Sequence, residues 1–276
     1  MKQYLATKDY FLTQESFELV LDENLDMLVT KPQPPELSKY YESENYISHT
    51  DGSKHLMDKI YRVAKKINLK NKLNLISKFV ESEKSILDVG AGTGDFLQLA
   101  KQHDWNIIGV EPNRHARQLA LKKNIEWKSE LTAIDGRKFE LITLWHVLEH
   151  LPDLEVNIAT FSRLLNDTGT LVIAVPNFKS HDAKHYQQFW AAYDTPRHLW
   201  HFSKRAIKKL FAVHDLELIK VSPMWFDAYY VSLLSESYKT GRRNWFKAFL
   251  VGSWSNFKGL YTKEYSSHIY FLKKVK

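Results

Sequence analysis

The chain has 276 residues, of which 44% are hydrophobic and 26% charged, and it contains no cysteine. This composition is typical of a globular protein with a substantial core. The absence of cysteine excludes disulfides, zinc sites with thiolate ligands, iron–sulfur clusters and cysteine nucleophiles. The first residues lack the pattern of a signal peptide, and no apolar run approaches the roughly 20 residues that span a bilayer. We therefore expect a cytoplasmic protein.

The net charge of +7 is distributed unevenly along the chain. Residues 1–50 carry 4 basic and 9 acidic side chains, whereas residues 201–276 carry 14 basic and 5 acidic ones. A basic C-terminal region attracts nucleic acid, an anionic membrane surface or a phosphorylated substrate, or it is a solvated face without a partner.

The first fifty residues differ in character from the rest of the chain. Short β-like runs at 17–20 and 27–30 precede a proline-rich stretch at 31–35 that predicts a turn or linker. Tyr40, Tyr41 and Tyr46 follow, and they would form either a lid over a ligand or an aromatic strap on the core. Apolar residues at helical spacing then predict a helix over 54–80.

From residue 84 onward, short apolar strands alternate with amphipathic helices. Helices are expected at 95–103, 114–123, 154–165 and 204–213, the last capped by Ser203. The expected strands are 85–89, 105–110, 125–128, 139–145, 170–175, 216–221 and 268–275. This alternation predicts an α/β protein with a mostly parallel sheet covered on both faces.

Residues 224–264, between the last two strands, form a predicted helical insert. Aromatic and aliphatic residues recur at helical spacing over 244–261. Three interpretations are open for this stripe: packing in the core, a cap over a substrate site, or a helix that lies on a membrane surface beside Arg242, Arg243 and Lys247.

A glycine-rich turn follows the first strand of the alternating region. The segment Asp88-Val89-Gly90-Ala91-Gly92-Thr93-Gly94 leads from strand to helix, so glycines allow a tight bend and a close approach of a ligand to the backbone. Glu111 ends the next strand, where a carboxylate accepts hydrogen bonds from ribose hydroxyls. The spacing differs from the Gly-x-Gly-x-x-Gly dinucleotide fingerprint.

Four segments in this order resemble the class I S-adenosylmethionine-dependent methyltransferases. They are residues 86–94, 109–113, 141–151 and 169–177, and the resemblance extends over roughly residues 54–222. It implies a Rossmann-like, doubly wound seven-stranded mixed sheet with an antiparallel last strand, in a domain over 51–276. It also implies S-adenosyl-L-methionine as the cofactor.

The resemblance implies the cofactor-binding residues as well. Asp88 and Gly90 would lie beside the methionine part and Glu111 would hold the ribose, while the main chain at 144–146 would flank the sulfonium. Ser129, Glu130 and Leu131 are the candidates beside the adenine. The full predicted cofactor set is Asp88, Gly90, Ala91, Gly92, Gly94, Glu111, Pro112, Ser129, Glu130, Leu144, Trp145 and His146.

The branch that the chain is most similar to is the ubiquinone-type O-methyltransferases, together with bacterial relatives that carry an N-terminal zinc knuckle. In those relatives a Cys-x-x-Cys pair stands where this chain has Asp22 and Leu25. We therefore expect residues 1–50 to keep a remnant of the knuckle shape without metal.

The segment His146-Val147-Leu148-Glu149-His150 has three interpretations. It matches a His-x-x-Glu-His metallopeptidase pattern, but it lies at a strand end and Pro152 follows closely. Some ubiquinone-type relatives bind metal at this spacing, although imidazole is a poor Mg²⁺ ligand. We prefer a structural turn beside the cofactor, and we expect no metal.

The segment 194–203 contains the candidate catalytic residues. It resembles a segment that faces the methyl acceptor in related enzymes. His198 is the preferred general base and His201 the alternate, since the histidine pKa lies near neutrality. In the alternative interpretation, Asp194 and Arg197 form a structural pair and a histidine caps the helix.

The sequence thus predicts a methyltransferase that O-methylates a small or lipid-linked acceptor. Alternatives are methylation of a sugar in surface glycan synthesis, an RNA methyltransferase that uses the basic C-terminal face, and a non-catalytic cofactor-binding protein. Contact with a membrane surface is a further expectation for the insert.

Overall fold

The computed structural model describes residues 2–41, 56–80, 83–134 and 136–275, with side chains described from Lys65 onward in the first long helix. The strands are β1 (Lys2–Lys8), β2 (Ser16–Asp22), β3 (Met27–Lys31), β4 (Ser85–Val89), β5 (Asn106–Val110), β6 (Glu126–Lys128), β7 (Phe139–Trp145), β8 (Leu165–Pro176), β9 (Trp200–His201), β10 (Leu216–Pro223) and β11 (Ser267–Lys274). The α-helices are α2 (Leu56–Ile76), α3 (Asp95–Lys101), α4 (Arg114–Ala120), α5 (Leu154–Leu164), α6 (His181–Tyr186), α7 (Lys204–Ala212), α8 (Asp227–Thr240) and α9 (Trp245–Thr262).

Seven strands form the central sheet in the order β10-β11-β8-β7-β4-β5-β6. The pairs among β8, β7, β4, β5 and β6 are parallel, and β11 is antiparallel to both β8 and β10. The predicted α/β fold with an antiparallel last strand is confirmed. Because all five parallel strands run the same way, their carboxyl ends meet at one edge of the sheet.

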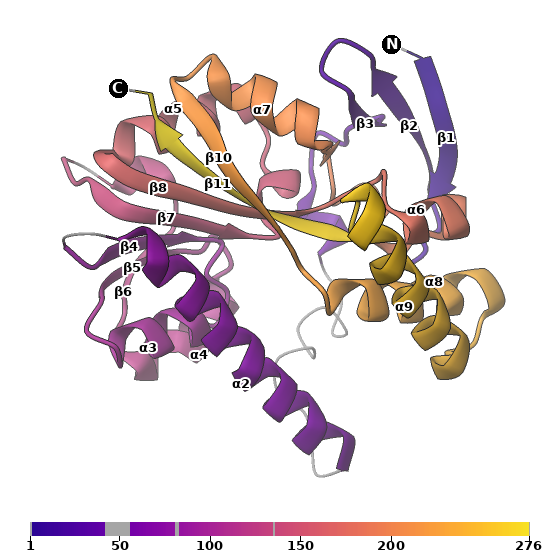
Figure 1. The fold of residues 1–276 in the computed structure, drawn as a ribbon, viewed down its shortest axis with the longest axis horizontal. Coiled ribbons are helices and arrows are strands. Elements are labelled where there is room, and N and C mark those ends of the chain that lie inside the picture. Colours follow the sequence, from indigo (N-terminus) through magenta and orange to yellow (C-terminus); the bar gives the residue numbers. More distant parts are fainter. Residues whose placement is uncertain (1, 42–55, 81–82, 135, 276) are drawn as a thin grey trace.

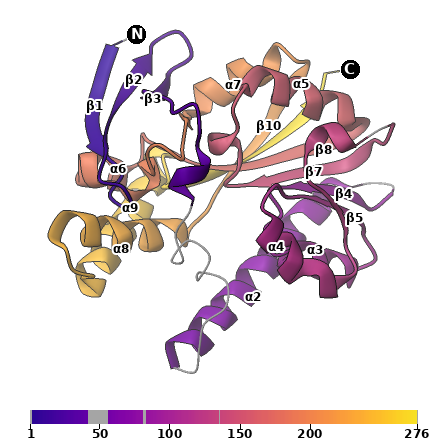
Figure 2. The same cartoon turned by 180° about the vertical axis from the view of Figure 1, so that it is seen from behind.

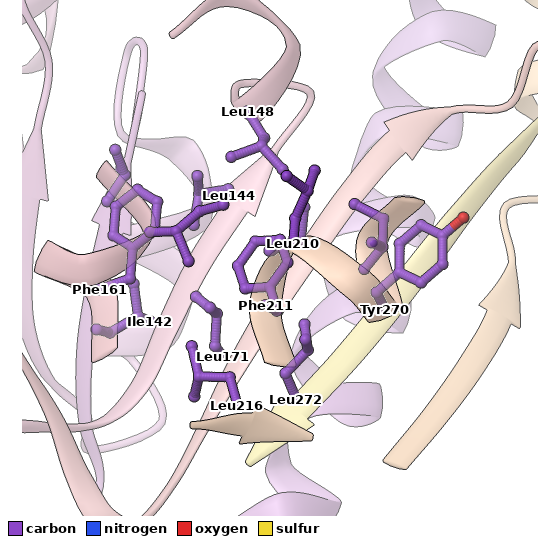
Figure 3. Packing of buried hydrophobic residues seen from close by; sticks show 14 of the residues in the cluster. Ile142, Leu144, Leu148, Phe161, Leu171, Leu210, Phe211, Leu216, Tyr270 and Leu272 are labelled. Carbon is purple, nitrogen blue, oxygen red and sulfur yellow. The ribbon is translucent and has the colours of Figure 1, made fainter. Parts of the chain in front are cut away.

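Helices cover both faces of this sheet. In Figures 1 and 2, α5 and α7 lie on one face and α2, α3 and α4 on the other. On the first face, Phe161 of α5 and Phe211 of α7 pack against Leu144 and Leu171 of the sheet (Figure 3). On the second face, Leu73 and Ile76 of α2 join Phe96 of α3 in a separate buried cluster. The fully buried strands explain why the sequence showed continuous apolar runs.

The N-terminal strands belong to a second, four-stranded sheet with the order β1-β2-β3-β9. Its last strand, β9, comes from the segment that follows the parallel sheet, and it pairs antiparallel with β3. Met27 and Val29 extend into the main buried cluster, so this sheet shares a core with the larger one. The expected boundary near residue 50 lies outside the described residues, and so does Tyr46.

The expected remnant of a knuckle falls on the turn between β2 and β3. There the Asp22 carboxylate accepts hydrogen bonds from the amides of Asn24 and Leu25, at 2.9 and 3.0 Å. A carboxylate thus caps the turn at one of the two positions that the sequence resemblance matched to knuckle cysteines. That residues 1–50 keep the knuckle shape without metal stays a prediction.

Polar residues cap several helices where the sequence indicated helix starts. The Ser203 hydroxyl accepts from the Ala206 amide at the start of α7, as predicted. Asn113 caps α4 and Asn244 caps α9 in the same way. Such caps satisfy amides that the first helical turn leaves without partners.

The helical insert between β10 and β11 consists of α8 and α9, which lie side by side at one end of the molecule (Figures 1 and 2). The sequence predicted a helical insert over 224–264, within which helical spacing marked the stretch of α9 but not that of α8. The large apolar residues of α9 are exposed, whereas its small residues are buried. The interpretation of the aromatic stripe as core packing is therefore wrong.

Candidate functional site

The glycine-rich turn after β4 has the backbone that its residues predict. Gly90, Gly92 and Gly94 have φ angles of 68°, 54° and 74°. A Cβ atom at Gly90 would lie 2.4 Å from Cγ2 of Val147, while one at Gly92 would meet no atom within 4 Å. The turn therefore requires glycine, and at Gly92 it presents open backbone to an approaching ligand.

Glu111 lies directly over this turn. Its Oε2 accepts a hydrogen bond from the Gly92 amide at 2.9 Å, and its Oε1 accepts one from the Asn113 amide at 2.8 Å. Arg117 donates to the Glu111 carbonyl. The ends of β4 and β5 thus bring the carboxylate and the glycines together, as the sequence predicted, and Pro112 follows in an exposed position.

Asp88 is buried at the end of β4, next to β7. The hydroxyl of Thr143 donates to its Oδ1 at 2.6 Å. Burial raises the pKa of this carboxyl to about 7, although Thr143 and Lys72 favour the charged form. Asp88 is therefore only partly ionised near neutrality, and a cationic ligand beside it would favour its ionised form.

Lys72, in α2, is a functional candidate that the sequence reasoning missed. Its Nζ lies 4.3 Å from the centroid of the Trp145 ring. Burial lowers the pKa of Lys72, while the carboxylates of Asp227 and Asp88 oppose that shift. A lysine in a predicted amphipathic helix gives no sequence signal of such a position, because only the packing of α2 against the sheet brings it to the site.

His146 ends the segment 144–146 predicted to flank the cofactor. Its φ is 57°, a left-handed backbone, and its ring is held between two carboxylates. Nδ1 lies 3.3 Å from Oε1 of Glu149, and Nε2 lies 3.0 Å from Oδ2 of Asp227. Burial alone would lower the pKa of His146, but these two contacts raise it to about 10. Asp227 opens α8, so the helical insert is tied to this edge of the sheet.

The candidates beside the adenine follow β6, at the same edge. Ser129 and Glu130 are exposed there, and Leu131 packs partly against the main core. An exposed Ser129 or Glu130 is accessible to a ligand, whereas the side chain of Leu131 is partly used in packing. Their contact with a cofactor stays a prediction.

The two candidate bases differ in their surroundings. His198 is buried, and its Nδ1 lies 2.9 Å from the carbonyl oxygen of Ala192, so Nδ1–H donates and Nε2 keeps its lone pair. Burial and the neighbouring His150 lower the pKa of His198 well below its usual value. Burial lowers the pKa of His201 to about 3, and its Nε2 contacts the Thr30 hydroxyl at 3.1 Å. Both rings are neutral at physiological pH.

The tyrosines expected to form a lid or a strap lie beside this region. Tyr40 is buried, and its hydroxyl donates to Oε2 of Glu15 at 2.5 Å, so it acts as a strap on the N-terminal sheet. The hydroxyl of Tyr41 lies 2.9 Å from Nδ1 of His150.

Among the residues that the structure describes, Glu149, His150 and His198 form a group that could hold a metal ion. Their ligand atoms lie within 4.8 Å of one another, and Oε2 of Glu149 is buried without a hydrogen-bond partner. Two imidazoles and a carboxylate suit zinc or iron(II) better than Mg²⁺. The sequence grouped His146 with Glu149 and His150 as possible metal ligands. In the structure both ring nitrogens of His146 contact carboxylates, those of Glu149 and Asp227. That the site works without metal stays a prediction.

A cavity of about 120 Å³ lies beside Lys72, between α2 and the connection from β10 to α8. Polar groups of Asn68, Asn71, Lys72 and Asp227 line it together with apolar side chains that include Met224 and Ile269. A mixed lining of this kind is typical of sites that bind small molecules.

Comparison with known proteins places this fold and site in a family. A family model described as a methyltransferase domain matches residues 57–221, which is more than half of the chain. The chain therefore belongs to the methyltransferase domain family.

Curated relatives match the chain over shorter stretches. The ubiquinone biosynthesis O-methyltransferase of Coxiella burnetii is 29% identical over 133 residues, which cover 42% of this chain and 56% of that protein. An uncharacterized methyltransferase of Bacillus cereus is 32% identical over 107 residues, which cover 36% and 50%. The chain thus spans about half the length of the curated relatives it matches.

Solved structures share the fold at low sequence identity. The magnesium protoporphyrin IX methyltransferase of Synechocystis, with bound SAH, gives a TM-score of 0.55 at 13% identity, over 86% of this chain and 97% of that one. A cyclopropane synthase of Mycobacterium tuberculosis gives 0.51 at 12% identity, over 74% and 83%. No helix in the described parts of the chain is both long and apolar enough to cross a membrane.

Proposed function

We propose that the protein is an S-adenosylmethionine-dependent methyltransferase that methylates a hydroxyl group of a small or lipid-linked acceptor. The observation that carries the proposal is the Glu111 carboxylate, which lies over the open backbone of Gly92. Family membership supports the methyl-transfer chemistry. The name of the Coxiella relative, a ubiquinone O-methyltransferase, supports an oxygen acceptor.

The residues at the site fit this cofactor. The open side of Gly92 lets a nucleoside approach the backbone, and Glu111 offers carboxylate oxygens for ribose hydroxyls. Asp88 supplies a buried carboxylate for the amino group of the methionine part. When bound, the cofactor supplies a methyl group on a positively charged sulfur. The main chain at 144–146 and the glycine turn would hold it, with Ser129 or Glu130 beside the adenine.

Binding of the cofactor is expected to weaken as the pH falls from 8 to 6. The Asp88 carboxyl, with a pKa of about 7, is mostly ionised at pH 8 and mostly protonated at pH 6, and only the ionised form attracts an ammonium group. If that form alone binds, the affinity falls up to about tenfold, and binding near pH 7 releases about half a proton per molecule. Calorimetry in two buffers with different protonation enthalpies measures both quantities.

Asp88→Asn is the matched control for this prediction. The variant should bind the cofactor more weakly, but with the same affinity at pH 6 and pH 8. Equal wild-type affinity at the two pH values would show that Asp88 does not titrate on binding.

The cavity beside Lys72 is where we place the acceptor. It adjoins Trp145, which ends the strand that would flank the cofactor, through the contact between Lys72 and the Trp145 ring. The enzyme's main task is to align the acceptor oxygen with the methyl carbon, which lowers the barrier by about 7–11 kcal/mol. The acceptor hydroxyl also loses its proton, so a base is needed as the oxygen–carbon bond forms and the carbon–sulfur bond breaks.

Lys72 is our candidate for the general base that takes the proton from the acceptor hydroxyl. It lines the cavity, and burial lowers its pKa toward the range in which an uncharged amine accepts a proton. A cationic cofactor nearby would lower that pKa further. His198, the base that the sequence favoured, is not among the residues that line this cavity, and its low pKa makes it a weak base.

The acceptor is identified by incubating the protein with methyl-labelled cofactor and fractionated extracts, and then determining which bond carries the label. We expect label on an alkali-stable methyl ether. Label on nitrogen or carbon would contradict the proposed hydroxyl acceptor, and cofactor binding without transfer to any fraction would favour a binding protein.

A further inference from the structure

The helix α9 differs from an ordinary amphipathic surface helix, because its large apolar side chains face the solvent and not the protein core. Apart from Val251, its buried positions are occupied by small or polar residues, among them Ala248, Gly252, Ser255 and Gly259. A Cβ atom at Gly252 would lie 2.8 Å from the Tyr229 ring, and one at Gly259 would lie 2.6 Å from the Tyr265 ring. Close packing therefore fixes which face of the helix points inward.

The outward half of α9 carries large apolar side chains, which we call the aromatic face. Phe246 is 74% exposed and Tyr261 is 73% exposed. The face consists of Trp245, Phe246, Phe249, Leu250, Trp254, Phe257, Leu260 and Tyr261. Rings along it touch one another: Trp254 stacks on Phe257 at 5.3 Å, and Phe257 contacts Tyr261 at 5.3 Å. Monomeric proteins rarely leave such a continuous apolar surface in water.

The charged residues of α9 and of the turn that precedes it are all basic. Between Ser237 and Lys263 the chain has six basic residues and no acidic residue. Lys258 lies on the flank of the face, with its Nζ 5.2 Å from the Trp254 ring, and Arg242 and Arg243 are exposed just before the helix. Lys247 forms an ion pair with Glu236 of α8. The Glu236 side chain is buried, so it adds no negative charge to the outer surface.

We propose that α9 is a peripheral docking element that seats its aromatic face in the interfacial layer of an anionic lipid bilayer. Tryptophan and phenylalanine in an amphipathic helix with flanking lysine and arginine match the chemistry of that layer. Anionic headgroups complement the six cations. A second copy of the chain fits less well, because a twofold contact would bring the cations of one face against those of the other.

The proposal connects the membrane to the site through α8. Asp227 at the start of α8 holds His146, and α8 packs along α9 (Figure 1). Docking would therefore place the cavity beside Lys72 near the bilayer surface. The docking itself does not depend on the methyl-transfer activity, so the two can fail separately.

Cosedimentation of the full chain with vesicles tests the proposal. We expect binding to vesicles of phosphatidylcholine mixed with phosphatidylglycerol, much weaker binding to phosphatidylcholine alone, and loss of binding at high salt. The double variant Phe246→Ser/Phe257→Ser should bind at least fivefold more weakly. Val213→Ser, at an equally exposed apolar position at the end of α7, is the matched control and should bind like wild type.

A second experiment separates the lipid from a second copy of the chain. Sedimentation velocity without lipid should give the same size for the wild type and the double variant. The proposal is overturned if the wild type does not bind anionic vesicles, if the double variant binds as well as the control, or if a wild-type dimer dissociates in the double variant. Unchanged cofactor affinity in the double variant shows that it remains folded.

Discussion

Replacing Arg197 by methionine is expected to lower the free energy of unfolding by about 3–5 kcal/mol. The guanidinium is buried, and it lies 2.9 Å from Oδ1 of Asp9 and 2.6 Å from Oδ1 of Asp194. It also donates to the carbonyl of Tyr40 at 3.1 Å. One side chain therefore joins the N-terminal sheet to the segment that carries the candidate bases, and its loss leaves the buried Asp9 and the partly buried Asp194 without this cation.

The pH dependence of stability distinguishes the loss of these ion pairs from a loss of packing alone. Although burial opposes the shift, Arg197 lowers the pKa of both Asp9 and Asp194. A carboxyl whose pKa is lowered in the folded state stabilises the protein above its unfolded pKa, and that contribution is lost as the pH falls. The difference in stability between wild type and Arg197→Met should therefore narrow below about pH 4.

Urea denaturation at pH 7 and at pH 3 measures both effects. Arg205→Met, at an exposed position on α7, is the control and should change the stability by less than about 0.5 kcal/mol. If Arg197→Met were as stable as this control, the buried ion pairs would not hold the N-terminal sheet in place.

Replacing Lys72 by methionine is expected to slow methyl transfer by about 100-fold, which is the contribution of a positioned general base. At pH 8, where Asp88 is mostly ionised, the cofactor affinity should not fall, because the substitution removes a positive charge beside a cationic ligand. A loss of kcat without a loss of binding separates a role in proton transfer from a role in folding the site.

The pH profile provides the second readout for Lys72. The wild-type kcat should rise with pH as the Lys72 ammonium deprotonates, and Lys72→Arg should not rescue the rate, because a guanidinium stays charged. Lys70→Met is the control on the exposed side of α2. If His198→Gln abolished transfer and Lys72→Met left it intact, His198 would be the base, as the sequence first suggested.

The sheet and the glycine turn could be predicted because their signals are local. Buried strands such as β4 and β7 are continuous apolar runs, and the glycines mark the turn that brings Glu111 over Gly92. The strand β1 gave no comparable signal, since most of its residues are exposed and its packing depends on β2.

Long-range contacts account for what the sequence did not show. Asp9 and Arg197 are 188 residues apart, and no local pattern links them. Lys72 and Asp227 reach the site only because α2 and the start of α8 meet at the end of β7, where Lys72 contacts Trp145 and Asp227 contacts His146. For α9, the small residues at helical spacing, such as Gly252 and Gly259, were the available signal that the aromatic residues point outward.

The most direct test of the central claim is a calorimetric titration of the wild-type chain and Glu111→Ala with S-adenosylmethionine. We expect wild-type binding with a Kd in the micromolar range, and an affinity at least tenfold lower, or about 1.4 kcal/mol, for Glu111→Ala. The variant loses the carboxylate proposed to hold the ribose and the contact with the Gly92 amide. Undetectable binding by the wild type, or equal affinity in the two proteins, would contradict the assignment of this site.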